Sequence, residues 1–274
     1  MTNISIKRFG QFKGSEVILA TLSGDNTSIS FMNWGAAIQN WTVNHSTKLQ
    51  NSVVLGFENF DFYPKFSPYF GSIVGRVINR INQGRFELNG INYQLDVNRS
   101  PNHLHGGITG FGKSIWDFET DEKENSITFS IKSNDGDGGY PGNVNVKAKY
   151  KLAGKKLTIE ISATVDRETP LNMGQHNYFN LCSQSEENYN ICNHLLYLNA
   201  ASFNEIFVLN TSVAAKLSRS INQALPRRPL PDVCNSATIQ VDFSRKQLLL
   251  IASALVLSIC FRKIRSYSVG QDVI

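Results

Sequence analysis

The sequence has neither the high charge of a disordered chain nor an apolar N-terminal signal segment. Only 18% of its 274 residues are charged, and 41% are apolar, which is typical of a folded domain rather than a disordered chain. The N-terminal stretch has no apolar segment of the kind that opens a secretory signal. We therefore expect a cytoplasmic protein built around one large domain.

Cysteine is also scarce. The four cysteines show no CxxC spacing and no dense framework; they are Cys182, Cys192, Cys234 and Cys260. Such a pattern favours reduced thiols over a disulfide scaffold.

The last quarter of the chain contains no glutamate and only one glycine, Gly270. No glycine lies between Asn210 and Val269, although β-rich domains need glycine at their turns. Residues 207–274 contain no glutamate and carry 9 Lys/Arg against 3 Asp/Glu, whereas residues 1–206 carry 18 against 19. These shifts predict a first domain over 1–206 and a divergent basic tail over 207–274.

The tail contains a mostly apolar segment at 248–261. This segment is shorter than the roughly 20 residues that cross a membrane as a helix, so we expect a buried helix or strand. A membrane-associated segment is the alternative. The basic residues of the tail are scattered and lack interleaved aromatics, which argues against a nucleic-acid partner.

The first two hundred residues have the pattern of successive strands. Asn89-Gly90 separates two alternating runs within 85–97, which predicts a tight hairpin. A second hairpin is predicted over 143–165, with apolar residues on one face of each strand and the turn at Ala153-Gly154. Shorter strands are predicted at 16–22, 28–32, 36–43, 126–132 and 194–199. No amphipathic helix is evident before about residue 205, so the sequence predicts an antiparallel all-β sandwich.

Two histidines stand one residue apart in "PNHLHGG" (101–107). Alternation along a strand would put His103 and His105 on one face, where they could bind a metal, but no third ligand is evident nearby. The alternative is a strand end whose histidines cap backbone groups before the Gly-Gly turn.

Two further segments are rich in hydrogen-bonding groups. "GRVINR" contains Asn79 and Arg80, which could grip neighbouring hydroxyls, and Arg76, which we expect on the surface in a salt bridge. "GQHNYFN" places His176 among Gln175, Asn177, Tyr178 and Asn180, side chains suited to a sugar. A satisfied core histidine is the alternative for His176.

Taken together, the chain from Tyr69 to Asn180 resembles the aldose 1-epimerases, or galactose mutarotases. The resemblance is carried by "GRVINRINQGRFELNGINYQL", "NRSPNHLHGGITGFGKSIW", "SNDGDGGYPGNVNVKAKYKL" and "PLNMGQHNYFNL", in that order, and the Gln-His pair is similar to the plant-type branch. It implies a β-supersandwich that binds a free hexose and opens its ring without a metal or redox cofactor. A sugar is the implied partner, and a monomer is expected.

The resemblance also implies residue roles. His176 matches the general acid that protonates the ring oxygen, and His105 matches the histidine that orients the sugar, leaving His103 as a variable neighbour. Asn79 and Arg80 match the pair that holds sugar hydroxyls, and Tyr178 is expected at the same site. The reaction needs an acid and a base on two sides of the anomeric carbon.

The C-terminal portion departs from the family pattern. The family's base is a glutamate near the C-terminus, and the tail offers only Asp232, Asp242 and Asp272. We therefore expect a sandwich that is incomplete at its C-terminus and an impaired epimerase. The alternatives are a sugar-binding pseudoenzyme, a hexose-6-phosphate epimerase, which would need a basic cluster that residues 1–206 do not show, and a protein tethered to a membrane by 248–261.

Overall fold

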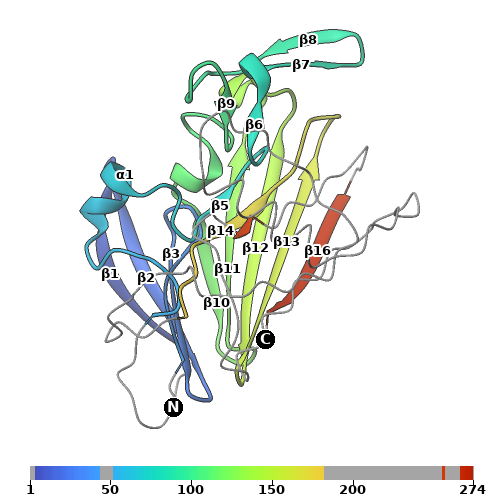
Figure 1. Cartoon of the computed structure of the whole chain (residues 1–274). Helices are drawn as coiled ribbons and strands as arrows, with labels where there is room; N and C mark the ends of the chain where they lie inside the picture. The colour runs from blue at the N-terminus through green and yellow to red at the C-terminus, as the bar shows by residue number, and fades with distance from the viewer. Residues whose placement is uncertain (1–3, 44–51, 182–254, 257–265, 274) are drawn as a thin grey trace, which may run out of the picture. The chain divides into compact units, whose positions relative to one another are not determined.

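The computed structural model describes residues 4–43, 52–181, 255–256 and 266–273, and strands dominate them (Figure 1). The helical segments are short: α1 spans Tyr63–Phe66, and 3-10 turns lie at Phe60–Phe62, Asn82–Gly84, Phe111–Lys113 and Asp137–Gly139. Among the described residues, every pair of named strands is antiparallel. The expected antiparallel all-β fold is confirmed, while its incompleteness at the C-terminus stays a prediction.

Two larger sheets make up most of this fold. The first is a meander of β1 (Ile4–Phe12), β2 (Ser15–Gly24), β3 (Thr27–Met32) and β4 (Ala37–Val43). The second has the order β10-β11-β12-β13-β16, with β10 at Asp117–Asp121, β11 at Ser126–Ser133, β12 at Val144–Ala153, β13 at Lys156–Val165 and β16 at Ser266–Val273. β2, β3, β4 and β11 confirm four of the short strands expected from sequence, and 194–199 lies outside the described residues.

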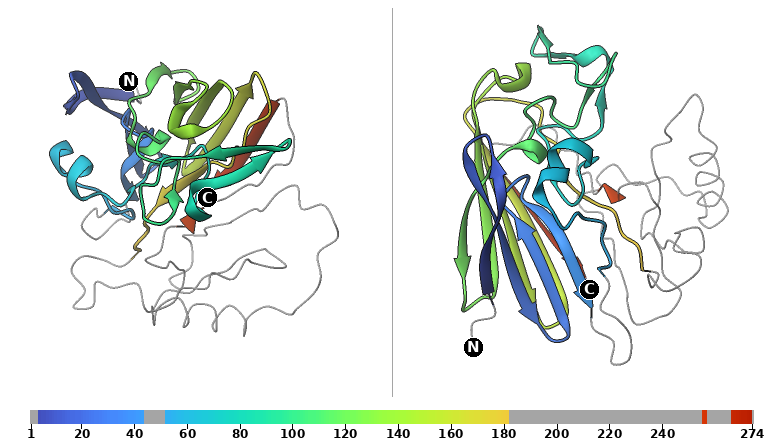
Figure 2. Two further views of the ribbon diagram at one scale, coloured as in Figure 1. Left: turned by 90° about the horizontal axis from the view of Figure 1, so that it is seen from above. Right: turned by 90° about the vertical axis from the view of Figure 1, so that its left-hand side faces the viewer.

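The core lies where the two sheets face each other. The β12–β13 hairpin has the predicted alternation, with Val144, Val146, Ala148, Tyr150 and Leu152 all buried. The ring of Tyr150 lies 4.7 Å from the ring of Phe31 in β3. The right-hand view of Figure 2 shows the long strands of both sheets running side by side. Apolar side chains from the two sheets thus build a common core.

Short strands position the predicted site residues. β5 (Ile73–Val74) pairs with β14 (Gly174–Asn177), which also pairs with β15 (Leu255–Val256), and β6 (Arg80–Ile81) pairs with β9 (His103–Leu104). The β7–β8 hairpin (Arg85–Leu88, Ile91–Gln94) stands at the top of Figure 1. Its turn residues Asn89 and Gly90 have φ of 53° and 76°, as the Asn-Gly signal predicts.

Most of the predicted tail lies outside the described residues, including the boundary at 206/207 and all of 248–261 except β15. Within the described part of the chain, no helix is long and apolar enough to cross a membrane.

Candidate active site

His105 and His176 lie face to edge. Their ring centroids are 5.0 Å apart, and the ring planes are almost perpendicular, at 87°. His105 is 8% exposed and His176 is 4% exposed. The structure thus brings together the two histidines predicted to be catalytic, from β14 and from the turn that follows β9.

Backbone and side-chain hydrogen bonds fix the strand that carries His176. The His176 N–H donates to the Ser72 carbonyl at 2.8 Å, and the Gly71 N–H donates to the His176 carbonyl at 2.9 Å. The side chain of Gln175 accepts from the Tyr150 hydroxyl at 2.7 Å and donates to the Gly71 carbonyl. Gln175, which looked suited to a sugar, is therefore engaged in holding the strand beneath His176.

His105 lies in a left-handed turn. β9 ends at Leu104, and the φ angles of His105, Gly106 and Gly107 are 53°, 84° and 88°. This conformation costs a non-glycine residue about 1–2 kcal/mol and is typical of functional sites when the surroundings enforce it. The shared face predicted for His103 and His105 is wrong, because strand alternation stops before His105.

Asn79 holds the His105 imidazole. The Asn79 N–H donates to His105 Nδ1 at 3.0 Å, and the His105 N–H donates to the Asn79 carbonyl at 3.1 Å. Because Nδ1 accepts, the neutral ring carries its proton on Nε2. Arg80 Nη1 lies 3.4 Å from the side-chain oxygen of Asn79, and both side chains are exposed. The predicted pair Asn79 and Arg80 thus lies beside His105.

Two tyrosines complete the cluster. The Tyr178 ring lies 5.1 Å from the His176 ring, and its hydroxyl donates to the Pro68 carbonyl at 3.0 Å. The Tyr69 ring lies 4.8 Å from His105 and 5.8 Å from His176. Sequence reasoning missed Tyr69. The signal that could have found it is the aromatic pair Tyr69-Phe70 that precedes Gly71, in the glycine-rich stretch that also contains Asn79 and Arg80.

Burial keeps both histidines neutral. It lowers the pKa of His105 to about 3, helped by repulsion from His176 and then from Arg80 and Lys113. It also lowers the pKa of His176 to about 4. His176 Nδ1 is buried and has no hydrogen-bond partner among the described residues. At pH 7 the cluster therefore presents two uncharged imidazoles and one unsatisfied ring nitrogen.

Arg76 contradicts its sequence prediction. It is only 2% exposed, and its guanidinium donates to the carbonyls of Ser133, Asn134 and Pro141. It also donates to the hydroxyls of Ser133 and Thr169. Arg76 is a buried anchor for the 133–141 loop rather than a surface ion-pair residue, because this loop supplies the carbonyl acceptors that burial requires.

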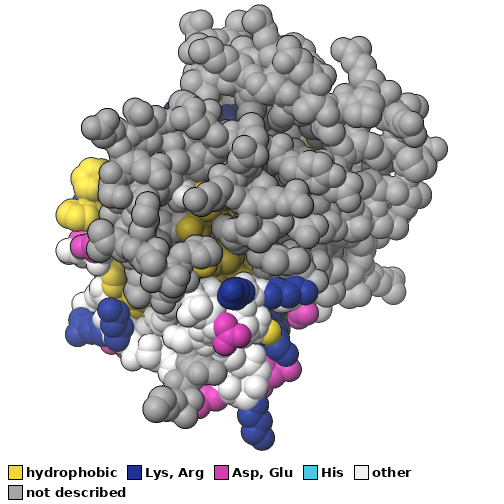
Figure 3. Space-filling model, turned by 60° about the horizontal axis from the view of Figure 1, so that its bottom comes forward, with side chains coloured by type: hydrophobic (Ala, Val, Ile, Leu, Met, Phe, Trp, Pro, Cys, Tyr) yellow, Lys and Arg dark blue, Asp and Glu magenta, His cyan; other side chains and the backbone are white. Residues whose placement is uncertain are grey.

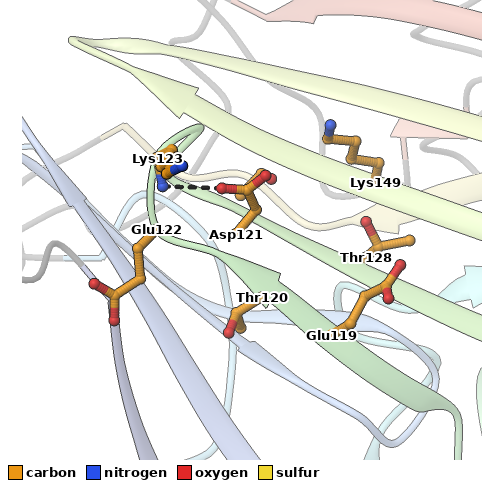
Figure 4. A pocket seen from close by; sticks show the side chains of 8 residues that line it. Glu119, Thr120, Asp121, Glu122, Lys123, Thr128 and Lys149 are labelled. Atoms are coloured by element: carbon orange, nitrogen blue, oxygen red, sulfur yellow. Dashed lines mark hydrogen bonds between the residues drawn. The ribbon is translucent and has the colours of Figure 1, made fainter.

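A second polar region lies over β10–β12, away from the residues that the sequence singled out. A hollow of about 610 Å³ is lined by Glu119, Thr120, Asp121, Glu122, Lys123, Ser126, Thr128 and Lys149 (Figure 4). Lys149 forms an ion pair with Glu124. Figure 3 shows acidic and basic side chains intermingled on the described part of one face, which is typical of a solvated surface. The described residues contain no group of three His, Cys, Asp or Glu side chains that could hold a metal.

Known proteins resemble the chain over the residues that build this cluster. The family model described as "Aldose 1-epimerase" matches residues 19–213. Galactose mutarotase of Mus musculus is 40% identical over 190 residues, which are 69% of this chain and 55% of that protein. Aldose 1-epimerase of Haemophilus influenzae is 37% identical over 226 residues, 82% of this chain and 61% of that protein.

Solved structures show the same fold. Galactose 1-epimerase of Lactobacillus acidophilus superimposes with a TM-score of 0.60 at 26% identity, covering 66% of this chain and 54% of its own. An aldose epimerase homologue from C. elegans gives 0.56 at 30% identity, covering 60% and 50%. The chain spans about half the length of the mammalian relatives it matches. Since the family model covers most of its residues, the chain belongs to the aldose 1-epimerase family.

Proposed function

We propose that the protein interconverts the α and β anomers of a free aldohexose such as galactose or glucose. The observation that carries this proposal is the pair of buried imidazoles, His105 and His176, whose rings lie 5.0 Å apart beside Asn79 and Arg80. The relatives are named galactose mutarotase and aldose 1-epimerase, and the matched region includes all four of these residues. No metal or redox cofactor is part of the proposal.

Each residue has a role that suits its contacts. His176 would donate the proton that the ring oxygen needs when the C1–O5 bond breaks. His105, with its proton on Nε2, would donate a hydrogen bond that orients the sugar. Arg80 and Asn79 would hold hydroxyl groups with their exposed side chains, and Tyr178 would flank the sugar beside His176. C1 then turns about the C1–C2 bond before the ring closes on the other face.

The supply of protons limits this reaction. With a pKa of about 4, His176 is protonated in only about one molecule in a thousand at pH 7. A carboxylate base beside it would raise that pKa and accept the C1 hydroxyl proton. The family's glutamate is missing from 207–274, and Asp232 and Asp242 lie outside the described residues. General-base catalysis contributes about 10²–10⁴-fold, so we propose a weakened epimerase.

The second candidate function is a sugar-binding protein without turnover. The lowered pKa values of both histidines favour it, because a neutral pair can hydrogen-bond hydroxyls without transferring a proton. The partner in either case is a small sugar. The monomeric state, the cytoplasmic location, the plant-type branch and the division into 1–206 and 207–274 stay predictions from sequence.

Polarimetry with freshly dissolved α-D-galactose and α-D-glucose tests the proposal. The full chain should accelerate mutarotation above the spontaneous rate. His176→Ala should remove about 10²–10⁴-fold of the acceleration, as expected for loss of a general acid, while Lys149→Ala in the hollow should leave it unchanged. A folded, soluble chain that gives no acceleration would contradict turnover, and galactose binding by that same sample would support the second candidate.

A further inference from the structure

His103 is not a passive neighbour of His105. It is fully buried, with Nε2 2.8 Å from the Tyr140 hydroxyl and Nδ1 2.7 Å from the Asp96 carbonyl oxygen. Nδ1 also lies 2.8 Å from Asp96 Oδ1. Because both Asp96 oxygens can only accept, Nδ1 carries a proton. Its hydrogen bond goes to the carbonyl oxygen, whereas Oδ1, which has no hydrogen-bond partner among the described residues, is in close electrostatic contact with the ring.

Asp96 links His103 to the turn that carries His105. Its Oδ2 accepts from the Ile108 N–H at 2.7 Å. A Cβ atom added at Gly107 would lie only 2.1 Å from Asp96 Oδ1, so the carboxylate rests directly against the turn. The Asp96 side chain is 23% exposed, and water would compete for it if His103 were lost. The contact of Oδ1 with His103 Nδ1 and the bond of Oδ2 with the Ile108 N–H together orient this carboxylate.

Asn98 secures the other end of the same turn. Its side chain accepts from the Leu104 N–H at 2.7 Å and donates to the Leu104 carbonyl at 2.9 Å. The turn between Leu104 and Ile108 is thus gripped at both ends by residues 96–98. His105 has a φ of 53°, which is strained for a non-glycine residue, and these hydrogen bonds keep its backbone from relaxing to an ordinary conformation.

We propose that His103, supported by Tyr140 and Asp96, is a positioning residue for His105. The inference rests on the proposed function for its kinetic consequence, but its structural consequence can be measured without turnover. His103 acts through the Asp96 carboxylate and does not touch the sugar. Loosening this support should move the His105 ring and weaken its Nδ1 bond to the Asn79 N–H.

Two variants of the full chain test the proposal. His103→Gln keeps a polar group near the Tyr140 hydroxyl but removes the Nδ1 donor to Asp96. Tyr140→Phe removes a single hydroxyl and is the milder change should His103→Gln fail to fold. The matched control is Tyr63→Phe, because Tyr63 is also a buried phenol whose oxygen accepts one hydrogen bond, from the Phe57 N–H at 3.0 Å. Tyr63 packs against the β1–β4 sheet, among Phe9, Trp34 and Phe60.

The first readout is the tautomer of His105, from the ¹⁵N shifts of its imidazole by NMR. Wild type and Tyr63→Phe should show the proton on Nε2, whereas His103→Gln and Tyr140→Phe should show mixed tautomers. The second readout is mutarotation, where kcat should fall about 10- to 100-fold with little change in KM, because a small misplacement of a site residue has effects of this size.

The two proposals fail in different ways. A wild-type chain without turnover would contradict the proposed function, and the ¹⁵N spectrum would still decide the role of His103. Folded His103→Gln and Tyr140→Phe proteins whose His105 keeps the wild-type tautomer would overturn the positioning role. So would a loss of kcat that Tyr63→Phe matches, since it would reflect general destabilisation.

Discussion

The histidine cluster and the hollow over β10–β12 are both polar, yet their side chains are held in opposite ways. The cluster gathers residues from several separate segments, and His105 and His176 are almost completely buried. The hollow is lined by neighbouring strands whose side chains mostly face water, and its ion pair joins Lys149 to Glu124, which are 35% and 40% exposed. The burial of both histidines, and a His176 ring nitrogen without a hydrogen-bond partner among the described residues, point to the cluster instead.

The largest expected difference is in stability, between the buried cation Arg76 and the half-exposed cation Lys149 of the hollow. Arg76→Met should lower the free energy of unfolding by about 3–5 kcal/mol, because it leaves the carbonyls of the buried residues Ser133 and Pro141 without their donor. Lys149→Met removes an exposed ion pair and should cost less than about 1 kcal/mol. Urea unfolding of both variants measures the contrast, and equal losses would contradict it.

The second prediction concerns pH. The pKa values of His105 and His176 are about 3 and about 4 in the folded chain, below the ordinary value of 6.5. Above pH 6.5 both rings are neutral in the folded and unfolded states, so they do not affect stability. Below pH 6.5 the unfolded chain takes up protons that the folded chain cannot, and stability falls by about 2 kcal/mol per histidine by pH 5.

A variant isolates this contribution. The double substitution His105→Gln and His176→Gln should flatten the decline in unfolding free energy between pH 6.5 and 5, as measured by urea unfolding at each pH. An equally steep decline in the double variant would mean that other groups cause it.

The third prediction concerns the packing of the backbone in the turn that carries His105. Gly106 and Gly136 have φ of 84° and 89°, but a Cβ atom at Gly106 would lie 1.5 Å from the Gly75 carbonyl oxygen, whereas one at Gly136 meets nothing within 4 Å. Gly136→Ala should lower the free energy of unfolding by about 1–2 kcal/mol through backbone strain alone. Gly106→Ala should lower it by about 1–3 kcal/mol more, because the added methyl group overpacks its surroundings. Thermal unfolding at one pH compares them, and similar losses would contradict the tight packing inferred around His105.

Local pattern predicted the hairpins but not every strand. The β12–β13 hairpin has one buried face, so its sequence alternates, and Asn89-Gly90 specifies the β7–β8 turn by its own chemistry. β10 is exposed along its whole length, and β1 is exposed along most of its length. A strand without a buried face shows no alternation of apolar and polar residues in its sequence, which is why β1 and β10 were not predicted.

The site was predicted in part for a similar reason. His105, His176, Asn79 and Arg80 were found through family resemblance, because their proximity depends on long-range pairings that no local pattern shows. Arg76 was misassigned, since its acceptors come from the distant 133–141 loop and from Thr169. The support of the His105 turn by Asp96 could not be predicted for the same reason, because it depends on long-range contacts of His103 with Asp96 and Tyr140.

The most direct test of where the function resides is an NMR titration of the full chain with D-galactose. The imidazole signals of His105 and His176 should shift with saturation, while the signals of Thr128 and Lys149 in the hollow stay unchanged. Shifts confined to Thr128 and Lys149 would contradict the assignment of the site to the histidine cluster.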